Sequence, residues 1–157
     1  MKRILAFGAA VTLLLMLASA ASANGPAVTE TISVVGDQFV CADDTYTIVS
    51  GDVRFTLHEG SSASGNENFT ITIAATKVEA VNSAGESFSI VGAFWAGFTA
   101  NAKTGGFQGT TTDHFQIISR GEGTVDSVQV TSHITFRPPD KFNVKEFNFG
   151  TCASPED

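Results

Sequence analysis

Apolar and polar residues alternate over long stretches of this chain, and this period of two restricts its fold more than any other feature. The stretches "VRFTLH" at residues 53–58 and "VQVTSHITF" at residues 128–136 place apolar side chains at every second position. Such alternation is the mark of a β-strand with one buried face and one solvated face. Beyond residue 23 no stretch shows the helical period of about 3.6, so the sequence predicts an all-β fold.

Turn-forming residues separate the alternating stretches at regular intervals. Clusters rich in Gly, Ser, Asn, Asp and Pro include "EGSSASGNEN" at 59–68 and "RPPD" at 137–140. They divide the chain into seven expected strands, at residues 29–41, 45–58, 69–81, 87–100, 107–119, 124–137 and 142–150. The alternation changes phase near Gly36, near Ala74–Ala75 and near Lys145–Glu146, which predicts β-bulges at these positions.

The expected strands are about twice as long as an average strand of about 5 or 6 residues. Long strands joined by short turns favour an antiparallel up-and-down β-barrel, or a strongly coiled sheet, of about seven to eight strands. A β-sandwich is the alternative. A barrel would have an apolar interior lined by Phe55, Ile73, Phe94 and Phe136.

The first 23 residues have the three parts of a secretory signal peptide. A basic start and an uncharged apolar run at residues 4–17 precede the small residues of "ASAASAN". The run is shorter than the roughly 20 residues that span a bilayer, so we expect no stable membrane insertion. We expect cleavage near Ala23, a secreted (extracellular or periplasmic) location, and one all-β domain at residues 24–157.

The chain has two cysteines, Cys41 and Cys152. In an oxidising compartment an isolated pair forms a disulfide, whereas a zinc site needs four ligands, usually at short spacings. We therefore predict one Cys41–Cys152 disulfide, no metal site and no cofactor.

The net charge of −7 restricts the partners. Nucleic-acid binding depends on clustered Lys and Arg side chains, which an acidic chain does not offer, so nucleic acid is excluded. The partners that we still expect are a small apolar ligand or another protein. We expect the protein itself to be a monomer or a weak homodimer.

One stretch departs from the alternation. "SIVGAFWAGF" at residues 89–98 is apolar on both faces. One face belongs to the expected core, and the other carries Val91, Ala93 and Trp95, the only tryptophan. Either the N-terminal segment or the 59–68 loop covers these three side chains, or they form a contact patch for a ligand or partner.

Catalytic motifs are absent from the sequence. It has no G-x-S-x-G elbow, no H-E-x-x-H and no phosphate-binding glycine loop. His114 and His133 fall on polar faces of neighbouring expected strands, as diagonal neighbours about 7 to 8 Å apart, while Asp113 faces the other way. The chain is therefore expected not to be an enzyme, and a small extracellular hydrolase using His114 or His133 is the alternative.

Several short stretches carry a resemblance. "FVC" at 39–41, "VSGDVRFTLH", "GGFQGTTTDHFQIISRGEG", "HITF" and a closing "FNFGTC" occur in this order along the chain. In this it resembles small secreted bacterial all-β proteins of uncharacterised function. The resemblance implies an exported all-β domain with a cysteine near each end, and it transfers no catalytic residue.

These observations predict a secreted, non-enzymatic β-barrel domain that binds a small apolar ligand or another protein. A structural protein of the cell surface is a further alternative.

Overall fold

The computed structural model of the protein describes residues 26–152, so the expected signal peptide lies outside the described residues. This part of the chain is all-β, as predicted, and has eight strands and no helix. None of it could therefore cross a membrane as a helix. The strands are β1 (Val28–Ser33), β2 (Gln38–Val40), β3 (Thr45–Ser61), β4 (Asn66–Val81), β5 (Ser87–Asn101), β6 (Phe107–Ser119), β7 (Gly123–Arg137) and β8 (Lys141–Asn148).

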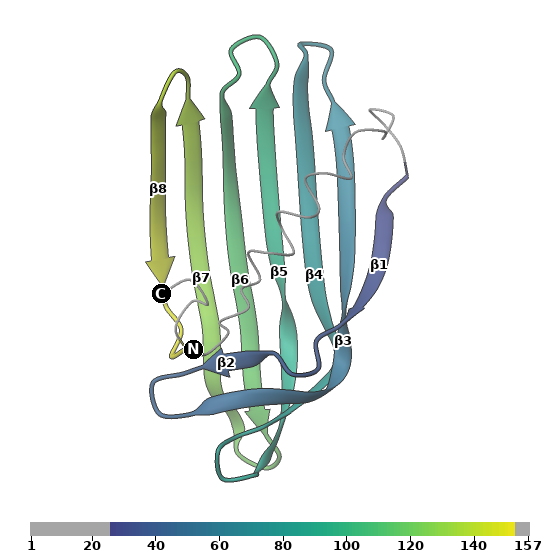
Figure 1. Cartoon of the computed structure of the whole chain (residues 1–157), viewed down its shortest axis with the longest axis vertical. Coiled ribbons are helices and arrows are strands. Elements are labelled where there is room, and N and C mark those ends of the chain that lie inside the picture. Colours follow the sequence, from purple (N-terminus) through teal and green to yellow (C-terminus); the bar gives the residue numbers. More distant parts are fainter. Residues whose placement is uncertain (1–25, 153–157) are drawn as a thin grey trace.

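The strands form one antiparallel sheet in which β3 to β8 lie side by side in chain order (Figure 1). The order is β1-β3-β4-β5-β6-β7-β8, and β2 pairs with the first residues of β3. This confirms the predicted all-β antiparallel arrangement of about seven to eight strands. The edge strands β1 and β8 do not pair with each other, so the described sheet is not closed into a barrel.

Three details of the expected strands can be compared with the structure. The expected first strand, 29–41, is two strands, and Gly36 lies in the turn between them rather than in a bulge. The bulge near Ala74–Ala75 is confirmed by a shift of register between Ala74 and Val78. The bulge near Lys145–Glu146 is wrong, because β8 pairs with β7 without a shift. The phase changes there because edge strand β8 is exposed along its whole length and carries apolar residues on both faces.

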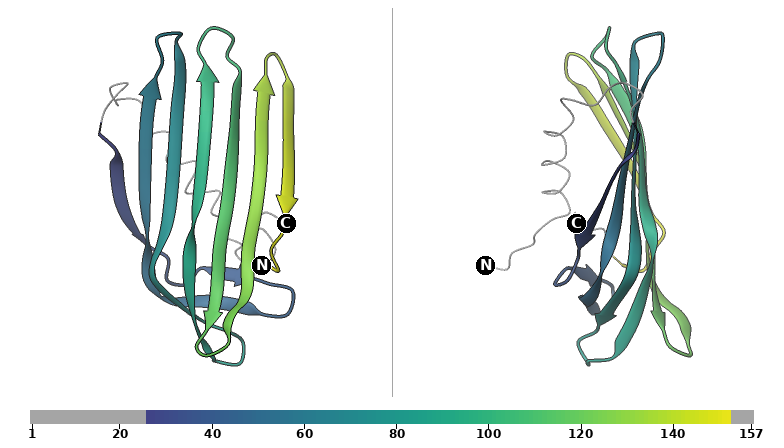
Figure 2. Two further views of the ribbon diagram at one scale, coloured as in Figure 1. Left: turned by 180° about the vertical axis from the view of Figure 1, so that it is seen from behind. Right: turned by 90° about the vertical axis from the view of Figure 1, so that its right-hand side faces the viewer.

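A sharp bend in β3 gives the sheet its coiled shape. Gly51 has a φ of +106°, and a Cβ atom there would lie 2.5 Å from the Lys77 carbonyl oxygen, so the bend requires glycine. Beyond the bend, β2 and the first part of β3 cross the lower ends of β5, β6 and β7 (Figure 1; Figure 2). The molecule thus has two layers at this end and one layer at the other.

The core lies where the two layers meet. Its buried side chains come from both layers and are Val34, Cys41, Tyr46, Ile48, Val53, Val78, Ala80, Phe88, Ile90, Phe115, Ile117, Val128, Val130 and Cys152. The cavity within this end has a volume of about 20 Å³, which is room for about one water molecule. None of the four side chains expected to line an apolar interior lines this cavity.

The predicted disulfide is confirmed. Cys41 follows β2 and Cys152 follows β8, and their sulfur atoms are 1.99 Å apart. The bond therefore ties the folded-over layer to the far edge of the sheet and closes the two-layered end.

Candidate functional site

The face of the sheet opposite the core, here called the polar face, carries side chains aligned in rows across the strands. Cross-strand pairing sets these rows. The central row consists of Thr70 on β4, Gly97 on β5, Thr110 on β6 and His133 on β7. The outer row lies two residues away from the central row on each strand, toward the β3–β4 hairpin end of the sheet, and consists of Asn68, Thr99, Gln108 and Thr135. Both rows lie in the single-layered half of the molecule.

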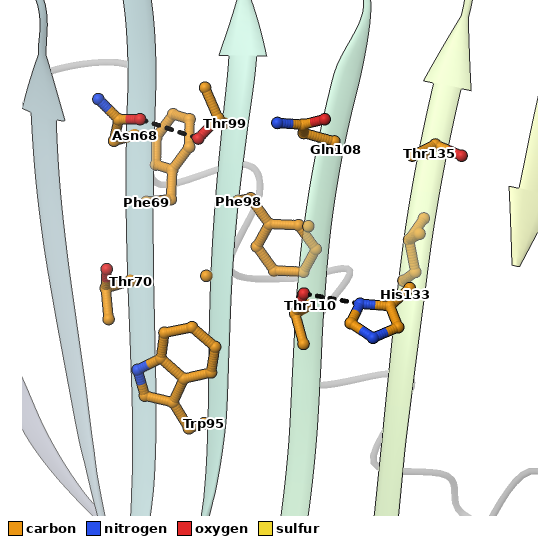
Figure 3. A pocket seen from close by; sticks show the side chains of 13 residues that line it. Asn68, Phe69, Thr70, Trp95, Phe98, Thr99, Gln108, Thr110, His133 and Thr135 are labelled. Carbon is orange, nitrogen blue, oxygen red and sulfur yellow. Dashed lines mark hydrogen bonds between the residues drawn. The ribbon is translucent and has the colours of Figure 1, made fainter. Parts of the chain in front are cut away.

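A shallow groove of about 430 Å³ follows these two rows (Figure 3). Its walls and floor include all eight row residues, Trp95, and the neighbouring Phe69, Phe98, Gly109 and Ile134. The volume is within the range of small-molecule sites, which is about 300 to 1,000 Å³. The groove crosses four strands and lies at right angles to them.

The indole of Trp95 forms part of the groove floor. A Cβ atom at Gly97 would lie 2.6 Å from Cη2 and 2.9 Å from Cζ2 of this ring. The ring therefore lies over Gly97, in the space that a side chain would occupy, and Figure 3 shows its flat side turned to the sheet. Figure 3 shows it between Thr70 and Thr110. Since Trp95 is 43% exposed, the indole face turned away from Gly97 meets solvent.

The three residues of the expected contact patch are not equivalent. All lie on the polar face, since Val91 pairs with Gln116 and Ala93 with His114. Val91 is exposed and Ala93 is half-buried, but only Trp95 lines the groove. Residues 59–68 do not bury the Trp95 ring; they form the tip of the β3–β4 hairpin.

Polar groups along the groove are only partly satisfied by each other. The Thr99 hydroxyl donates a hydrogen bond to Asn68 Oδ1 at 2.9 Å. In the part of the chain that the structure describes, the Asn68 NH₂ group has no hydrogen-bond partner. Thr110 Oγ1 and His133 Nδ1 are 3.0 Å apart and share a hydrogen bond. Within residues 26–152, the Gln108 amide and the Trp95 indole N–H have no hydrogen-bond partner. The groove therefore offers hydrogen-bonding groups beside an aromatic surface.

Formal charge is absent from the groove lining. None of its thirteen residues is Asp, Glu, Lys or Arg. The acidic and basic side chains that give the chain its net charge of −7 lie elsewhere. The site thus matches an uncharged ligand better than an ionic one.

The histidines do not form the expected diagonal pair. His133 pairs with Thr110 and His114 pairs with Gln129, so the two stand four residues apart along the strands, about 13 Å. A diagonal contact requires a separation of two residues. Asp113 faces the core side, opposite His114, as expected. Within the described range the His133 side chain hydrogen-bonds to a hydroxyl and to no carboxylate.

Cys41, Asp126 and Cys152 bring three metal-ligand atoms close together in residues 26–152. The two sulfur atoms are bonded to each other, so they are not thiolates that could bind an ion. Asp126 instead accepts a hydrogen bond of 2.5 Å from the Tyr46 hydroxyl. This cluster lies at the packed end, and its three residues line neither the groove nor the small cavity of about 20 Å³.

Sequence patterns alone had pointed to Trp95 but not to the groove around it. Asn68, Thr70, Gln108 and Thr110 are ordinary members of alternating strands, and nothing in each strand marks them. What brings them together is the register between strands. It places one amide and one hydroxyl from β4 on one side of Trp95, and one amide and one hydroxyl from β6 on the other side.

Comparison of the chain with protein-family models, with curated proteins and with solved structures finds no match. The groove therefore has to be interpreted from its own chemistry.

Proposed function

We propose that the protein is an exported, non-enzymatic binding domain whose groove on the polar face binds neutral carbohydrate. The observation that carries this proposal is the solvent-facing Trp95 ring, laid flat over Gly97 and flanked by the hydroxyls of Thr70 and Thr110. A pyranose ring has an apolar C–H face and a rim of hydroxyls. A flat aromatic surface with hydrogen-bonding groups at its sides complements both.

The polar lining changes the expected ligand. The sequence predicted a small apolar ligand or a protein partner, bound in a barrel interior or on the Val91, Ala93 and Trp95 patch. A purely apolar ligand would leave Asn68, Gln108 and the indole N–H without partners, which costs binding free energy. An amphipathic ligand uses the aromatic face and the polar groups together.

Export is supported by the Cys41–Cys152 disulfide, because such bonds persist in oxidising compartments outside the cytosol. The signal-peptide pattern at residues 1–23 agrees with this location. The proposed binding needs neither a closed barrel nor a catalytic group.

Intrinsic fluorescence tests the proposal directly, because Trp95 is the only tryptophan. Neutral oligosaccharides of glucose, xylose, mannose and N-acetylglucosamine are titrated into the protein. We expect at least one class to give a saturable change in Trp95 emission, with the same affinity by calorimetry. Trp95→Ala should weaken calorimetric binding at least tenfold.

Val91→Ala is the matched control, since Val91 is equally exposed on the same strand and face but lies outside the groove. It should change the affinity less than twofold. The proposal is overturned if no oligosaccharide class binds, or if a proline-rich peptide binds in the groove and the sugars do not. Equal losses in both variants would instead favour the original patch.

A further inference from the structure

The groove is an open channel across the sheet rather than a pocket for one sugar. We infer that it binds the interior of a linear neutral glycan, at least three consecutive units long, with the chain running across the strands from β4 to β7. This inference rests on the proposed function and specifies the form of its ligand.

The length of the groove supports several units. Its central row runs from Thr70 on β4 to His133 on β7, which is three steps between neighbouring strands. Strands lie about 4.8 Å apart, so the row spans about 14 Å. One strand step is close to the length of one sugar unit in an extended glycan. The row thus has the length of about three units.

The polar groups repeat on both sides of the aromatic floor. On β4, Asn68 and Thr70 place an amide and a hydroxyl two residues apart on the polar face. On β6, which runs in the same direction as β4, Gln108 and Thr110 do the same. Trp95 on β5 lies between the two pairs, as Figure 3 shows. This arrangement provides a stacking surface for a central unit and one amide–hydroxyl pair for each neighbouring unit.

Both ends of the central row are open. Beyond Thr70 the row continues to His58 on β3, and beyond His133 it continues to Lys145 on β8. Both of these side chains are exposed. A longer chain can therefore leave the groove at either end, which fits recognition of a chain interior and not of a chain terminus.

Chain length is the variable that tests the inference. Affinities are measured by Trp95 fluorescence for the oligomers, from one unit to six, of whichever neutral glycan class binds. We expect the affinity to rise at least tenfold from one unit to three and to change less than twofold from four to six. Methyl groups on both terminal positions of the hexamer should leave its affinity unchanged.

Amide substitutions test the flanking positions. Gln108→Ala should weaken binding of the trimer about three- to tenfold and leave binding of the single unit unchanged, as expected for one lost hydrogen bond. Gln116→Ala is the matched control, because Gln116 is on the same strand and face, outside the groove. It should have no effect on either ligand.

The outcomes separate the two proposals. If a single unit binds as tightly as the trimer, or if blocked ends abolish binding, the groove recognises one sugar and this inference is wrong while the proposed function stands. If no neutral sugar of any length binds, the proposed function itself fails.

Discussion

At the scale of single residues, the position of the Trp95 ring depends on a neighbour that has no side chain. Gly97 lies two residues along β5, on the same face, and the indole occupies the space above it. Any side chain at residue 97 would compete with the ring for this space. The aromatic floor of the groove is therefore the product of two residues.

Gly97→Ala tests this dependence. The new Cβ would lie 2.6 Å from the Trp95 ring, and the ring can turn away more easily than the strand can move. We expect sugar binding to fall about as far as in Trp95→Ala, while the unfolding midpoint shifts only slightly. Calorimetry measures the binding, and near-UV circular dichroism reports the new ring position. Unchanged binding in this variant would show that the flat pose of the ring is not required.

Tyr46 is the second residue with a specific role, at the opposite end of the molecule. Its ring is 4% exposed, and its hydroxyl donates to Asp126. Burial of the phenol, and then the hydrogen bond and negative charge of Asp126, raise the pKa of Tyr46 far above its usual 10.0. The unfolded chain ionises near the usual value, so above about pH 10 it has lost a proton that the folded state retains.

Folding stability should therefore fall as the pH rises above about 10. Tyr46 is the only tyrosine, so tyrosinate absorbance reports on it alone. We expect no tyrosinate signal from the folded protein at about pH 11, and its appearance together with unfolding. Tyr46→Phe should lack this part of the alkaline loss of stability. Ionisation of the folded protein near the usual value would contradict the assigned hydrogen bond.

At the scale of elements, the strands could be predicted because their signals are local. Alternation and turn clusters placed the expected strands 45–58, 87–100 and 124–137 within a few residues of β3, β5 and β7. The expected strand at 29–41 was wrong as one strand, because the four residues 34–37 form a turn that divides it into β1 and β2. So short a turn can interrupt an apolar run without a strong change in composition.

The groove could not be predicted, because it depends on register. A slip of one residue exchanges the faces of a strand, and the sequence of one strand does not fix its partner's alignment. Thr110 pairs with His133 because of two features: the length of the 120–122 turn, and a shift of register between Ile117 and Ile118. Such features are properties of pairs of strands. Trp95 was found from sequence because it breaks the pattern within its own strand.

Gly92 is the residue that lets β5 pass closely by β6. Its φ is +132°, and a Cβ atom there would lie 2.0 Å from the carbonyl oxygen of His114. Gly92→Ala should destabilise the fold by about 3 kcal/mol or more, from the strained backbone and the contact with β6. Gly85→Ala is the control, since Gly85 has a φ of +82° with no atom within 4 Å of its Cβ position. Its cost should be about 1 to 2 kcal/mol. If urea unfolding gives the same loss of unfolding free energy for both variants, β6 shifts to accommodate the new methyl group.

At the scale of the whole molecule, the disulfide is what holds the two layers together covalently. Cys41 and Cys152 are 111 residues apart in sequence, so the bond closes almost the entire described chain into a loop. In the chain-entropy account, closing a loop of this length stabilises the folded state by about 5 kcal/mol. Most of the sheet lies between the two cysteines.

Reduction should therefore lower the free energy of unfolding by about 5 kcal/mol, measured by urea titration with and without a reductant. Cys41→Ser paired with Cys152→Ser should reproduce the loss without a reductant. Where the reduced protein is still folded, sugar affinity should match that of the oxidised form, because the groove lies in the other half of the sheet. A loss of less than about 1 kcal/mol would mean that packing alone holds the layers together.

The rows on the polar face also determine how such a protein can change. Each strand contributes one side chain to each row, and the next residue along the strand points to the opposite face. Substitutions in a row therefore leave the core residues of the same strand in place. A library of variants would therefore change the ligand specificity of the groove without changing the fold. It would vary Asn68, Thr70, Gln108, Thr110, His133 and Thr135. The sheet thus keeps its backbone and core while the ligand specificity of the groove changes through substitutions on one strand at a time.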